Sequence, residues 1–600
     1  MSALTTLPPG LAVLAAALVL PLLSRRVGHA LGLLATGGVL LWVYLLPSGT
    51  YLEVPFLGFE AVLLNVDELS VLMGLIFAFI GAVAVGYSYA TEADTTQTAF
   101  ALGYVGTSLL AVFAGDWLTL VFFVELMAAA STLLVWHYRG RAVRAGFRYA
   151  LWHGLGGSLI LAGVVWHYVE VGSFLFGAAD GIAPGVPAAL YALGFGVNVG
   201  YVGLHVWLPD TYPRPHIAAS VFLCVYTTKT GVYGLGRAFP DGHLWLAYMG
   251  GAMAVFGAFT ALLQNDMRRL LSYHIQSQVG YMVAGVGIGS ALAFSGAFGH
   301  VFNHILYKSL LFMCAGAIIY RTGTENLKKL GGLWREMPLT GVIFGVAALS
   351  IAGFPGFNGF VSKGMVVGAA HKEHLDALWY ILLLGGVGTF LSFIKFGYYA
   401  FFHGEAQQPV PGRELNLGQK AAMGSVAALC VLYGLVPGAL FAILPGVEAG
   451  AYAALPGAGA STYTVFTVGH LVEGFGLAAL GLVGFALLRG PLSRVGRVPD
   501  VDAVYNRAVF YGSRAVVVGV TELYAAVDRV AVGVARTAVW TARNPVPALD
   551  RVAPWMLPDA RANGDREVDP ELDVNIGQAT FVVLGVLVVG LLLLFLATVG

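Results

Sequence analysis

The sequence contains few charged residues. Asp, Glu, Lys and Arg make up 11% of its 600 residues, against roughly 25% in an ordinary soluble domain. So little charge cannot cover a water-facing surface, which excludes a soluble globular protein. Apolar residues reach 58%, there are 80 glycines, and the mean hydropathy is +0.79. This composition predicts a polytopic membrane protein whose exterior mostly faces lipid.

Cysteine is also scarce, and the formal net charge is +0. Cys224, Cys314 and Cys430 each lie inside an apolar run without CxxC spacing, which argues against a disulfide framework or a metal site. A neutral chain gives no reason to expect nucleic-acid binding. Flavin, quinone and iron-sulfur motifs are missing too, so we predict neither a cofactor nor a metal, and no redox enzyme.

Apolar runs long enough to cross a bilayer recur along the whole chain. At roughly 20 residues per helix, they predict an all-α protein with about 16 transmembrane helices. We expect N-terminal transmembrane helices over 1–97, additional ones over 415–490 and a C-terminal transmembrane anchor over 579–599. Between the last two, 501–551 has the apolar and charged spacing of a cytoplasmic amphipathic helix that binds the membrane or a partner.

Loop charge predicts how the helices are oriented. Lys and Arg collect on the cytoplasmic side of membrane proteins, and the basic loops here alternate as an outside N-terminus requires. The loop at 47–66 carries Glu53 and Glu60 without Lys or Arg, so we place it outside. The pattern has an exception, because Glu92 and Asp94 lie in a predicted inside loop without basic neighbours.

Two helices look interrupted. Pro209, Pro213 and Pro215 crowd the junction of the predicted seventh and eighth helices, and Gly353–Gly359 splits the twelfth. Proline removes a backbone donor and clashes with the preceding turn, so such breaks free carbonyl oxygens at membrane depth. Paired broken helices are typical of transporters with inverted repeats.

Several ionisable residues lie inside apolar runs, where each costs on the order of 3 kcal/mol. Glu125 and Lys229 are each flanked by apolar residues, and Lys363 and Lys395 lie within or beside predicted helices. Buried carboxyl and amine groups are candidate proton carriers. His470 and Glu473 also share a helix face, but they lie near a helix start. A position at the membrane surface explains them as well as a role in transport does.

His300, His304 and Lys308 recur every four residues inside one apolar run. This spacing puts them on one face of a helix, in a ladder about 12 Å long. Two histidines at this spacing can also bind a metal, but the sequence supplies no third ligand in the form of an HExxH glutamate. Three titratable groups on one stripe indicate a proton relay.

Several motifs, in order over roughly residues 60 to 405, carry a resemblance to a known family. They are His205–Asp210, the segment around Lys229, Asp266–Tyr281, His300–Lys308, Thr322–Leu333 and Gly353–Lys363. Together they resemble the antiporter-like subunits of respiratory complex I and of Mrp-type sodium/proton antiporters. The segment around Lys395 looks most like the D subunit of Mrp antiporters.

The resemblance implies two inverted five-helix repeats with broken helices, at 98–237 and 244–402. It also implies roles: Glu125 as the glutamate of the first half channel, Lys229 as the central lysine, His304 and Lys308 as the linking relay, and Lys363 as the lysine of the second broken helix. Where the family pattern has a lysine paired with the glutamate, this chain has Asn198.

Asparagine cannot titrate, so Glu125 lacks its usual partner, which His153 on the neighbouring helix could replace. We therefore expect a proton-translocating, non-enzymatic subunit of a multi-subunit cation (Na⁺)/proton antiporter in a prokaryotic plasma membrane. Its expected partners are other subunits, lipid, protons and Na⁺. One alternative is a proton-pumping subunit of complex I or a membrane-bound hydrogenase. Another is a structural subunit that no longer conducts.

Overall fold

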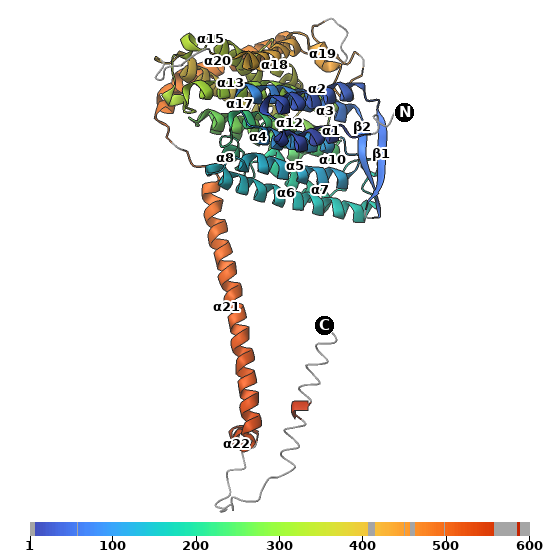
Figure 1. Ribbon diagram of the computed structural model, residues 1–600, viewed down its shortest axis with the longest axis vertical. Coiled ribbons are helices and arrows are strands. Elements are labelled where there is room, and N and C mark those ends of the chain that lie inside the picture. The colour runs from blue at the N-terminus through green and yellow to red at the C-terminus, as the bar shows by residue number, and fades with distance from the viewer. Residues whose placement is uncertain are drawn as a thin grey trace, which may run out of the picture. The chain divides into compact units, whose positions relative to one another are not determined.

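The structure is a computed structural model that describes residues 7–556, with gaps at 57, 406–413, 449, 457–461 and 497, together with residues 585–587. The chain divides into two compact units, Met1–Asp502 and Ala503–Gly600. The first unit is a helical bundle with one long hairpin (Figure 1). The predicted anchor at 579–599 lies outside the described residues, apart from 585–587.

The first unit begins with three helices, a short 3₁₀ turn and a β-hairpin. They are α1 (Pro9–Val19), η2 (Leu20–Leu22), α2 (Arg25–Leu45), β1 (Gly49–Phe56), β2 (Phe59–Val66) and α3 (Glu68–Ala90). The strands pair antiparallel, from Gly49 opposite Val66 to Phe56 opposite Phe59. The all-α prediction is wrong for this segment, which we expected to be a loop. Its backbone groups are satisfied across the hairpin and by Asp116, whose carboxylate accepts a 2.7 Å bond from the Val62 N–H.

A first helix group follows, numbered α4 to α10. Its members are α4 (Thr95–Val112), α5 (Trp117–Trp136), α6 (Arg141–Val171), η3 (Phe176–Ala178), α7 (Val186–Val199), α8 (Trp207–Thr211), α9 (Ile217–Leu223) and α10 (Tyr226–Ala238). This group covers most of the predicted first repeat.

A second helix group runs from α11 to η5. Its members are α11 (Leu244–Leu262), α12 (Met267–Ile288), α13 (Ala291–Thr322), η4 (Leu327–Lys329), α14 (Leu333–Glu336), α15 (Pro338–Ala352), α16 (Asn358–Lys372), α17 (Asp376–Gly397) and the π-helical turn η5 (Tyr398–Phe402). This group spans residues 244–402, and whether it is a repeat of the first group stays a prediction.

The remaining elements complete the chain. In the first unit they are α18 (Leu417–Leu435), α19 (Pro437–Phe441), β3 (Tyr452–Ala453), β4 (Tyr463–Thr464) and α20 (Val468–Arg494), and β3 pairs parallel with β4. α21 (Asp502–Arg543) and α22 (Pro545–Met556) follow. The segment 501–551, expected to be helical, is helical over most of its length.

Capping residues define where matching helices begin and end in the two groups. The carboxylate of Asp116 caps α5 and that of Asp266 caps α12, each accepting from a backbone N–H three residues on. The long helices α6 and α13 both end at a left-handed glycine, Gly172 and Gly323. Glycine adopts this conformation without the steric cost that a Cβ would bring.

Both predicted interruptions exist, and the first includes a break at glycine as well as the predicted one at proline. α7 ends at the left-handed Gly200, seven residues before α8 begins at Trp207, and Pro209 lies within α8. Gly200 therefore ends α7, and Pro213 and Pro215 lie in the break between α8 and α9, where the proline cluster predicted an interruption. The second falls where predicted, since α15 ends at the left-handed Gly353 and α16 begins at Asn358. A further break separates α9 from α10 at residues 224–225, without any proline.

The centre of the first unit is α13. Nearly all residues in the most apolar part of this helix are buried. The helix packs against α3, α9, α12, α15, α16 and α18. Among the described helices, eight are long and apolar enough to cross a membrane: α2, α3, α5, α6, α11, α13, α17 continued by η5, and α20. The count of about 16 spans therefore stays a prediction.

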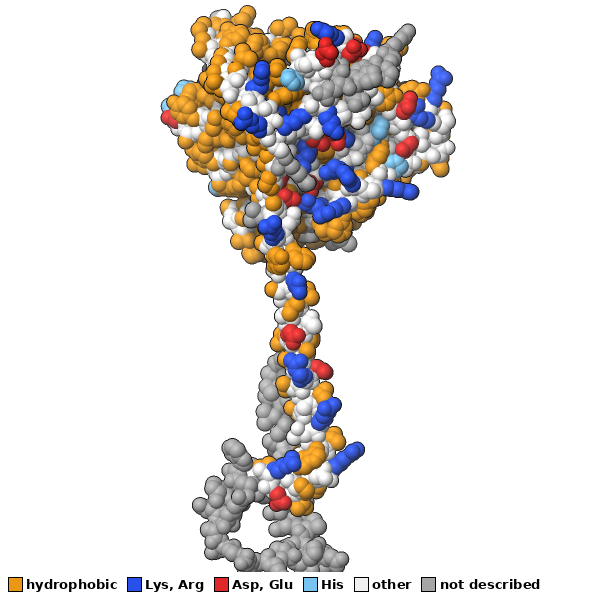
Figure 2. All heavy atoms as spheres, turned by 90° about the vertical axis from the view of Figure 1, so that its left-hand side faces the viewer, with side chains coloured by type: hydrophobic (Ala, Val, Ile, Leu, Met, Phe, Trp, Pro, Cys, Tyr) orange, Lys and Arg blue, Asp and Glu red, His pale blue; other side chains and the backbone are white. Residues whose placement is uncertain are grey.

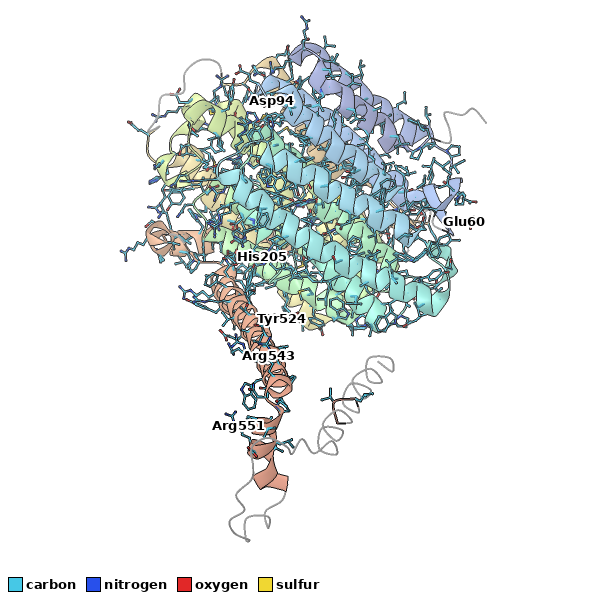
Figure 3. The ribbon with its side chains drawn as sticks, turned by 60° about the horizontal axis from the view of Figure 1, so that its bottom comes forward. Glu60, Asp94, His205, Tyr524, Arg543 and Arg551 are labelled. Carbon is cyan, nitrogen blue, oxygen red and sulfur yellow. The ribbon has the colours of Figure 1, made fainter. Side chains whose placement is uncertain are left out.

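The two ends of the bundle differ in charge. Lys and Arg side chains gather on the end away from the β1–β2 hairpin (Figure 2). Glu60, on the hairpin, and Asp94, at the start of α4, lie at opposite ends of the bundle (Figure 3). This polarity agrees with a cytoplasmic face at the Arg-rich end and an outer face at the hairpin.

Candidate functional site: a buried chain of titratable residues

The predicted ladder lies on α13, inside the bundle. His300, His304 and Lys308 are each fully buried, and the ring centroids of the two histidines are 6.3 Å apart. Within the described part of the chain, neither ring nitrogen of His304 nor the Lys308 Nζ has a hydrogen-bond partner. Buried polar groups are usually paired with protein or water. These atoms therefore have free bonding capacity for water or for a transferred proton.

One end of the ladder connects to Lys363. The His300 Nδ1 lies 3.0 Å from the Ser362 hydroxyl on α16, next to Lys363 in sequence. The Lys363 Nζ donates a 3.0 Å bond to the Ile351 carbonyl oxygen and lies 4.6 Å from the centroid of the Tyr281 ring. The break after α15 frees this carbonyl, so the predicted interruption supplies the acceptor for the lysine.

The other end of the ladder approaches Lys229. The Lys229 Nζ donates to the Cys224 carbonyl oxygen at 2.5 Å and to the Thr228 hydroxyl at 3.0 Å. The Cys224 thiol lies 3.9 Å from the hydroxyl of Ser309, which follows Lys308 on α13. The unpredicted break between α9 and α10 frees the Cys224 carbonyl.

Lys395 has the same kind of partner. Its Nζ donates to the carbonyl oxygens of Leu262, at 2.8 Å, and Gln264, at 2.7 Å, where α11 ends. Three buried lysines thus donate to backbone carbonyl oxygens at a helix C-terminus: Lys229, Lys363 and Lys395. The helix dipole favours positive charge at this end of a helix. Sequence reasoning could not identify these acceptors, because any residue can supply a carbonyl.

The first helix group arranges its candidate residues differently. The His153 Nδ1 lies 2.9 Å from the Asn198 Oδ1, so His153 contacts the asparagine that we predicted to replace the family's lysine. Glu125 is half-buried and has no hydrogen bond or ion pair to another described residue. Its carboxyl lies over Gly157 of α6, where a Cβ would come within 1.6 Å of Oε1. Gly157 is one helical turn from His153, on the same face.

A hydroxyl chain that the sequence did not reveal leads from His153 towards Lys229. The Tyr149 ring lies 4.1 Å from that of His153, centroid to centroid, and its hydroxyl lies 3.0 Å from that of Thr227. The Tyr104 hydroxyl is 2.6 Å from the same threonine. The sequence alone gives little reason to expect this chain, because tyrosine and threonine inside apolar helices usually contribute to packing.

The connector between α20 and α21 joins the two helix groups at the Arg-rich end. The Asp500 carboxylate lies 3.3 Å from the Nε2 of His205 and accepts bonds from the Tyr273 hydroxyl and the Val501 N–H. Burial alone would raise the pKa of Asp500, but these bonds outweigh it and leave the pKa below its ordinary value. Beside it, Arg148 bonds the carboxylates of Asp210 and Asp502.

The described residues contain no group of three or more His, Cys, Asp or Glu side chains arranged to hold a metal ion. The two ladder histidines instead contact hydroxyls: His300 lies between Ser362 and Tyr307, whose hydroxyl is 3.2 Å from the His300 Nε2. The site is suited to moving protons among titratable side chains, hydroxyls and water.

Apolar helices, broken where buried lysines need acceptors, define a multi-pass membrane protein with an internal polar chain. The family model described as NADH:quinone oxidoreductase/Mrp antiporter, TM, matches residues 114–392. The D subunit of the Na⁺/H⁺ antiporter of Alkalihalophilus pseudofirmus is 30% identical over 364 residues, which are 57% of this chain and 73% of that protein. The chain belongs to this family of antiporter-like membrane subunits, as its motifs predicted.

Two further likenesses extend over more of the chain. An uncharacterized protein of Mycobacterium tuberculosis is 32% identical over 476 residues, 73% of this chain and 72% of that protein. A chain of the membrane-bound sulfane sulfur reductase, an archaeal respiratory membrane complex, has the same fold, with a TM-score of 0.69 at 24% identity over 97% of this chain and 99% of that one.

Proposed function

We propose that this chain is the proton-translocating subunit of a multi-subunit Na⁺/H⁺ antiporter, similar to the D subunit of Mrp antiporters, in a prokaryotic plasma membrane. The observation that carries the proposal is the fully buried ladder of His300, His304 and Lys308, with Lys229 near one end and Lys363 near the other. Burying these groups in a bilayer costs several kcal/mol, which supports a role for them in transport.

In this proposal, the proton moves along the ladder in steps. Lys229 exchanges a proton with Lys308 across the Cys224 and Ser309 side chains, which lie 3.9 Å apart. His304, whose ring nitrogens have no partner among the described residues, passes the proton to His300. His300 passes it through the Ser362 hydroxyl, 3.0 Å away, towards Lys363.

The helix-end carbonyls give each lysine two positions. A protonated amine is held by the carbonyl at the break, as Lys363 is by Ile351 at 3.0 Å. A neutral amine loses most of that attraction, because the carbonyl favours the charged donor. Loss of the proton would therefore free the side chain to turn towards its next partner. Lys395, bound at the end of α11, would serve at the far end of the second group.

Two inverted five-helix repeats, 98–237 and 244–402, are the scaffold of this proposal. They are supported by matching local structure: the Trp117 N–H bonds the Phe174 carbonyl at 2.9 Å, and the Met267 N–H bonds the Glu325 carbonyl at 2.9 Å. Each bond ties the start of one helix to the chain that follows the next helix, at corresponding places in the two groups.

Vesicles test the proposal directly. The assembly that copurifies with the tagged full-length chain is reconstituted, a Na⁺ gradient is imposed, and proton flux is recorded with an internal pH dye. We expect Na⁺-driven proton flux in wild type and its loss in Lys308→Ala. Flux of normal size in a fully assembled Lys308→Ala complex would contradict the proposal.

A second candidate is a proton-pumping subunit that takes its energy from redox chemistry in other subunits, as in complex I or a membrane-bound hydrogenase. It is favoured by the fold likeness to a respiratory complex, which extends over 97% of this chain, whereas the match to the antiporter D subunit spans 57%. Iron-sulfur subunits in the purified assembly would favour this candidate, and small antiporter subunits would favour the first. A non-conducting structural subunit is the remaining alternative.

Partner subunits are proposed to bind the helical segment at 501–551. α21 is a single helix of 42 residues, and it exposes many large apolar side chains, among them Phe510, Val517 and Tyr524. An exposed apolar stripe on a long helix suits a groove on a partner or a membrane surface. Deleting this segment should lower the yield of the assembly, which size-exclusion chromatography measures.

A further inference from the structure

α20 adds a carboxyl group to the surroundings of Lys363. Glu473 is half-buried in the second turn of this helix and forms no hydrogen bond or ion pair with another described residue. α20 lies beyond the segment that matches the family model, 114–392, and beyond both predicted repeats. Glu473 is therefore not one of the residues that the duplicated scaffold would supply.

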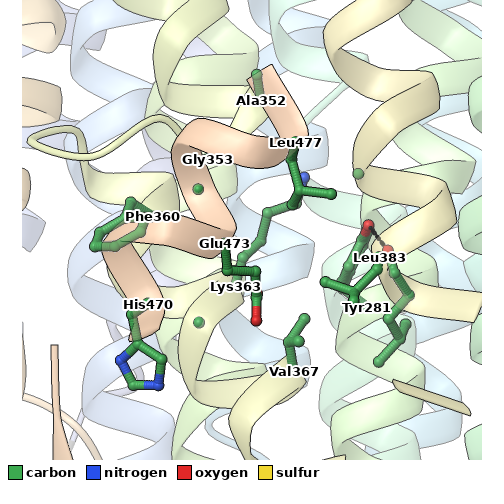
Figure 4. Close-up of a pocket in the computed structure, with 14 residues that line it drawn as sticks. Tyr281, Ala352, Gly353, Phe360, Lys363, Val367, Leu383, His470, Glu473 and Leu477 are labelled. Atoms are coloured by element: carbon green, nitrogen blue, oxygen red, sulfur yellow. Dashed lines mark hydrogen bonds between the residues drawn. The ribbon is translucent and has the colours of Figure 1, made fainter. Parts of the chain in front are cut away.

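Glu473 and Lys363 line the same cavity (Figure 4). Tyr281 and His470 contribute further polar groups to the lining, and Phe360 and Leu477 contribute apolar walls. The cavity measures about 40 Å³, and a water needs roughly 10 to 15 Å³ on this measure, so it has room for about three. A short water chain between the amine and the carboxyl fits this space.

Close helix contacts build the cavity. At Gly474, next to Glu473, an added Cβ would lie 3.0 Å from atoms of both Pro355 and Phe360 at the second helix break. At Gly386 on α17, an added Cβ would lie 3.3 Å from Leu477. α20 therefore packs closely against the helix break beside Lys363. This packing fixes the position of Glu473.

The cavity lies towards the hairpin end of the bundle. The loop before α20 reaches the start of α3, where the Gly446 N–H donates to the Glu68 carboxylate at 2.7 Å, and Glu68 directly follows the hairpin strands and Asp67. Lys372, at the end of α16, bonds the Thr462 carbonyl in the same loop. Glu473 thus lies between Lys363 and the face that loop charge predicts to be outside.

We propose that Glu473 is the proton outlet of the second helix group, connecting Lys363 to the outer face; this rests on the proposed function. The Lys363 ammonium gives up one N–H proton to the cavity water chain, and the far end of that chain protonates the Glu473 carboxylate. Lys363 is left as a neutral amine. Glu473 then releases the proton to bulk water and returns to its carboxylate form.

His470 has a positioning role in this outlet. Its Nδ1 lies 3.0 Å from the Val465 carbonyl, and its ring stacks on Tyr463 at 5.2 Å between centroids. These contacts fix the first turn of α20, and with it the carboxyl one turn further on. His470 is not itself required to carry the proton.

The test compares Glu473→Gln with Glu448→Gln in the reconstituted assembly. Glu448 is a matched control, because it is exposed in the loop before α20 and outside the cavity lining. We expect Glu473→Gln to lower proton flux about a hundredfold or more, the typical effect of losing a proton-transfer group, and Glu473→Asp to recover part of it. Glu448→Gln should keep wild-type flux.

Labelling supplies a readout that does not depend on transport or on Glu473→Gln assembling. Cys224, Cys314 and Cys430 are buried, so a cysteine placed at Glu473 can be labelled above a low background. A membrane-impermeant maleimide should label Glu473→Cys from the outer side of intact cells. Labelling only from the cytoplasmic side, or normal flux in Glu473→Gln, would overturn the outlet proposal.

Lys363→Ala separates failure of the outlet from failure of the proposed function. If Lys363→Ala is inactive and Glu473→Gln transports normally, the outlet is wrong and the proposed function stands. If Lys363→Ala itself transports normally, the proposed role of the second helix group is wrong, and the outlet proposal is overturned with it.

Discussion

The first and second helix groups have similar backbones and different chemistry. Asp116 and Asp266 cap matching helices, and Gly200 and Gly353 end the helices that are interrupted. Yet the first group places Asn198 beside His153, whereas the second places Lys363 on a carbonyl at its helix break. Two helix groups with matching caps and breaks can therefore differ in chemistry, because each group can change its few buried polar side chains independently.

The polar contacts sharpen this difference. In the second group, Lys363 is held at 3.0 Å by a carbonyl that the helix break frees. In the first group, the His153 Nδ1 lies 2.9 Å from the Asn198 Oδ1, and Glu125 has no hydrogen bond or ion pair to another described residue. The second group therefore has a titratable amine at its helix break, whereas His153 in the first group contacts an amide that cannot titrate.

The largest effect is expected for the lysines of the ladder region. Lys229→Ala, Lys308→Ala and Lys363→Ala should each lower proton flux by about a hundredfold or more, since each removes a proton carrier that no neighbour replaces. Lys420→Ala, which removes an exposed lysine at the start of α18, should leave flux unchanged. Flux in vesicles, with assembly checked by copurification, measures both. A mild Lys229→Ala defect would count against a continuous path between the groups.

Glu125→Gln should give an intermediate defect, of about tenfold. A carboxyl that no longer served transport would be costly to keep at that depth, and the hydroxyl chain through Tyr149 and Thr227 links its surroundings to the Lys229 region. The same vesicle assay measures it, with Glu170→Gln at the exposed end of α6 as control. Near-normal flux in Glu125→Gln would instead mean that the first group is silent.

Much of the fold could be predicted from the sequence, because apolar length and glycine signals are local. The helix break at Gly353 and the buried stripe on α13 follow from spacing alone. The β1–β2 hairpin was missed, since hydropathy detects helical spans and not short strands. The break at residues 224–225 was missed because neither proline nor glycine marks it, and it is tertiary packing that places Lys229 on the Cys224 carbonyl.

The candidate site was predictable in part for the same reason. Titratable residues inside apolar runs stand out in a sequence, and the structure buries His300, His304 and Lys308 on one helix as the spacing predicts. Their partners come from distant segments: Ser362 is 62 residues from His300, and the Leu262 carbonyl is 133 residues from Lys395. Such pairs depend on the packing of whole helices, which a single sequence does not reveal.

Asn198→Lys should reduce flux and assembly, and should not restore a second pathway. Asn198 is 1% exposed, and its Cβ lies 3.1 Å from the position of a Cβ on Gly231, so a longer side chain has little room. The new ammonium would also be buried beside His153. The described residues show no helix-end carbonyl there to accept its hydrogen bonds, unlike at Lys229, Lys363 and Lys395. Asn198→Gln, which adds length without charge, is the control. Flux above wild type in Asn198→Lys would mean that the first group lacks only its cation.

The smallest effect concerns the connector that ties the two groups together. Asp500→Asn should destabilise the assembly by about 1 to 3 kcal/mol, because His205 of the first group and Tyr273 of the second lose a charged partner in a buried place. Asp180→Asn, in the exposed turn before α7, is the control, and Tm in detergent measures both.

The pH dependence of this difference tests its cause. Folding lowers the pKa of Asp500, so its carboxylate contributes full stability above the ordinary Asp value of about 4, and the contribution is lost as pH falls through the lower folded value. The Tm gap between wild type and Asp500→Asn should therefore persist at neutral pH and narrow only below about pH 4. A gap that already closes near neutral pH would contradict the assignment of this stabilisation to the Asp500 carboxylate.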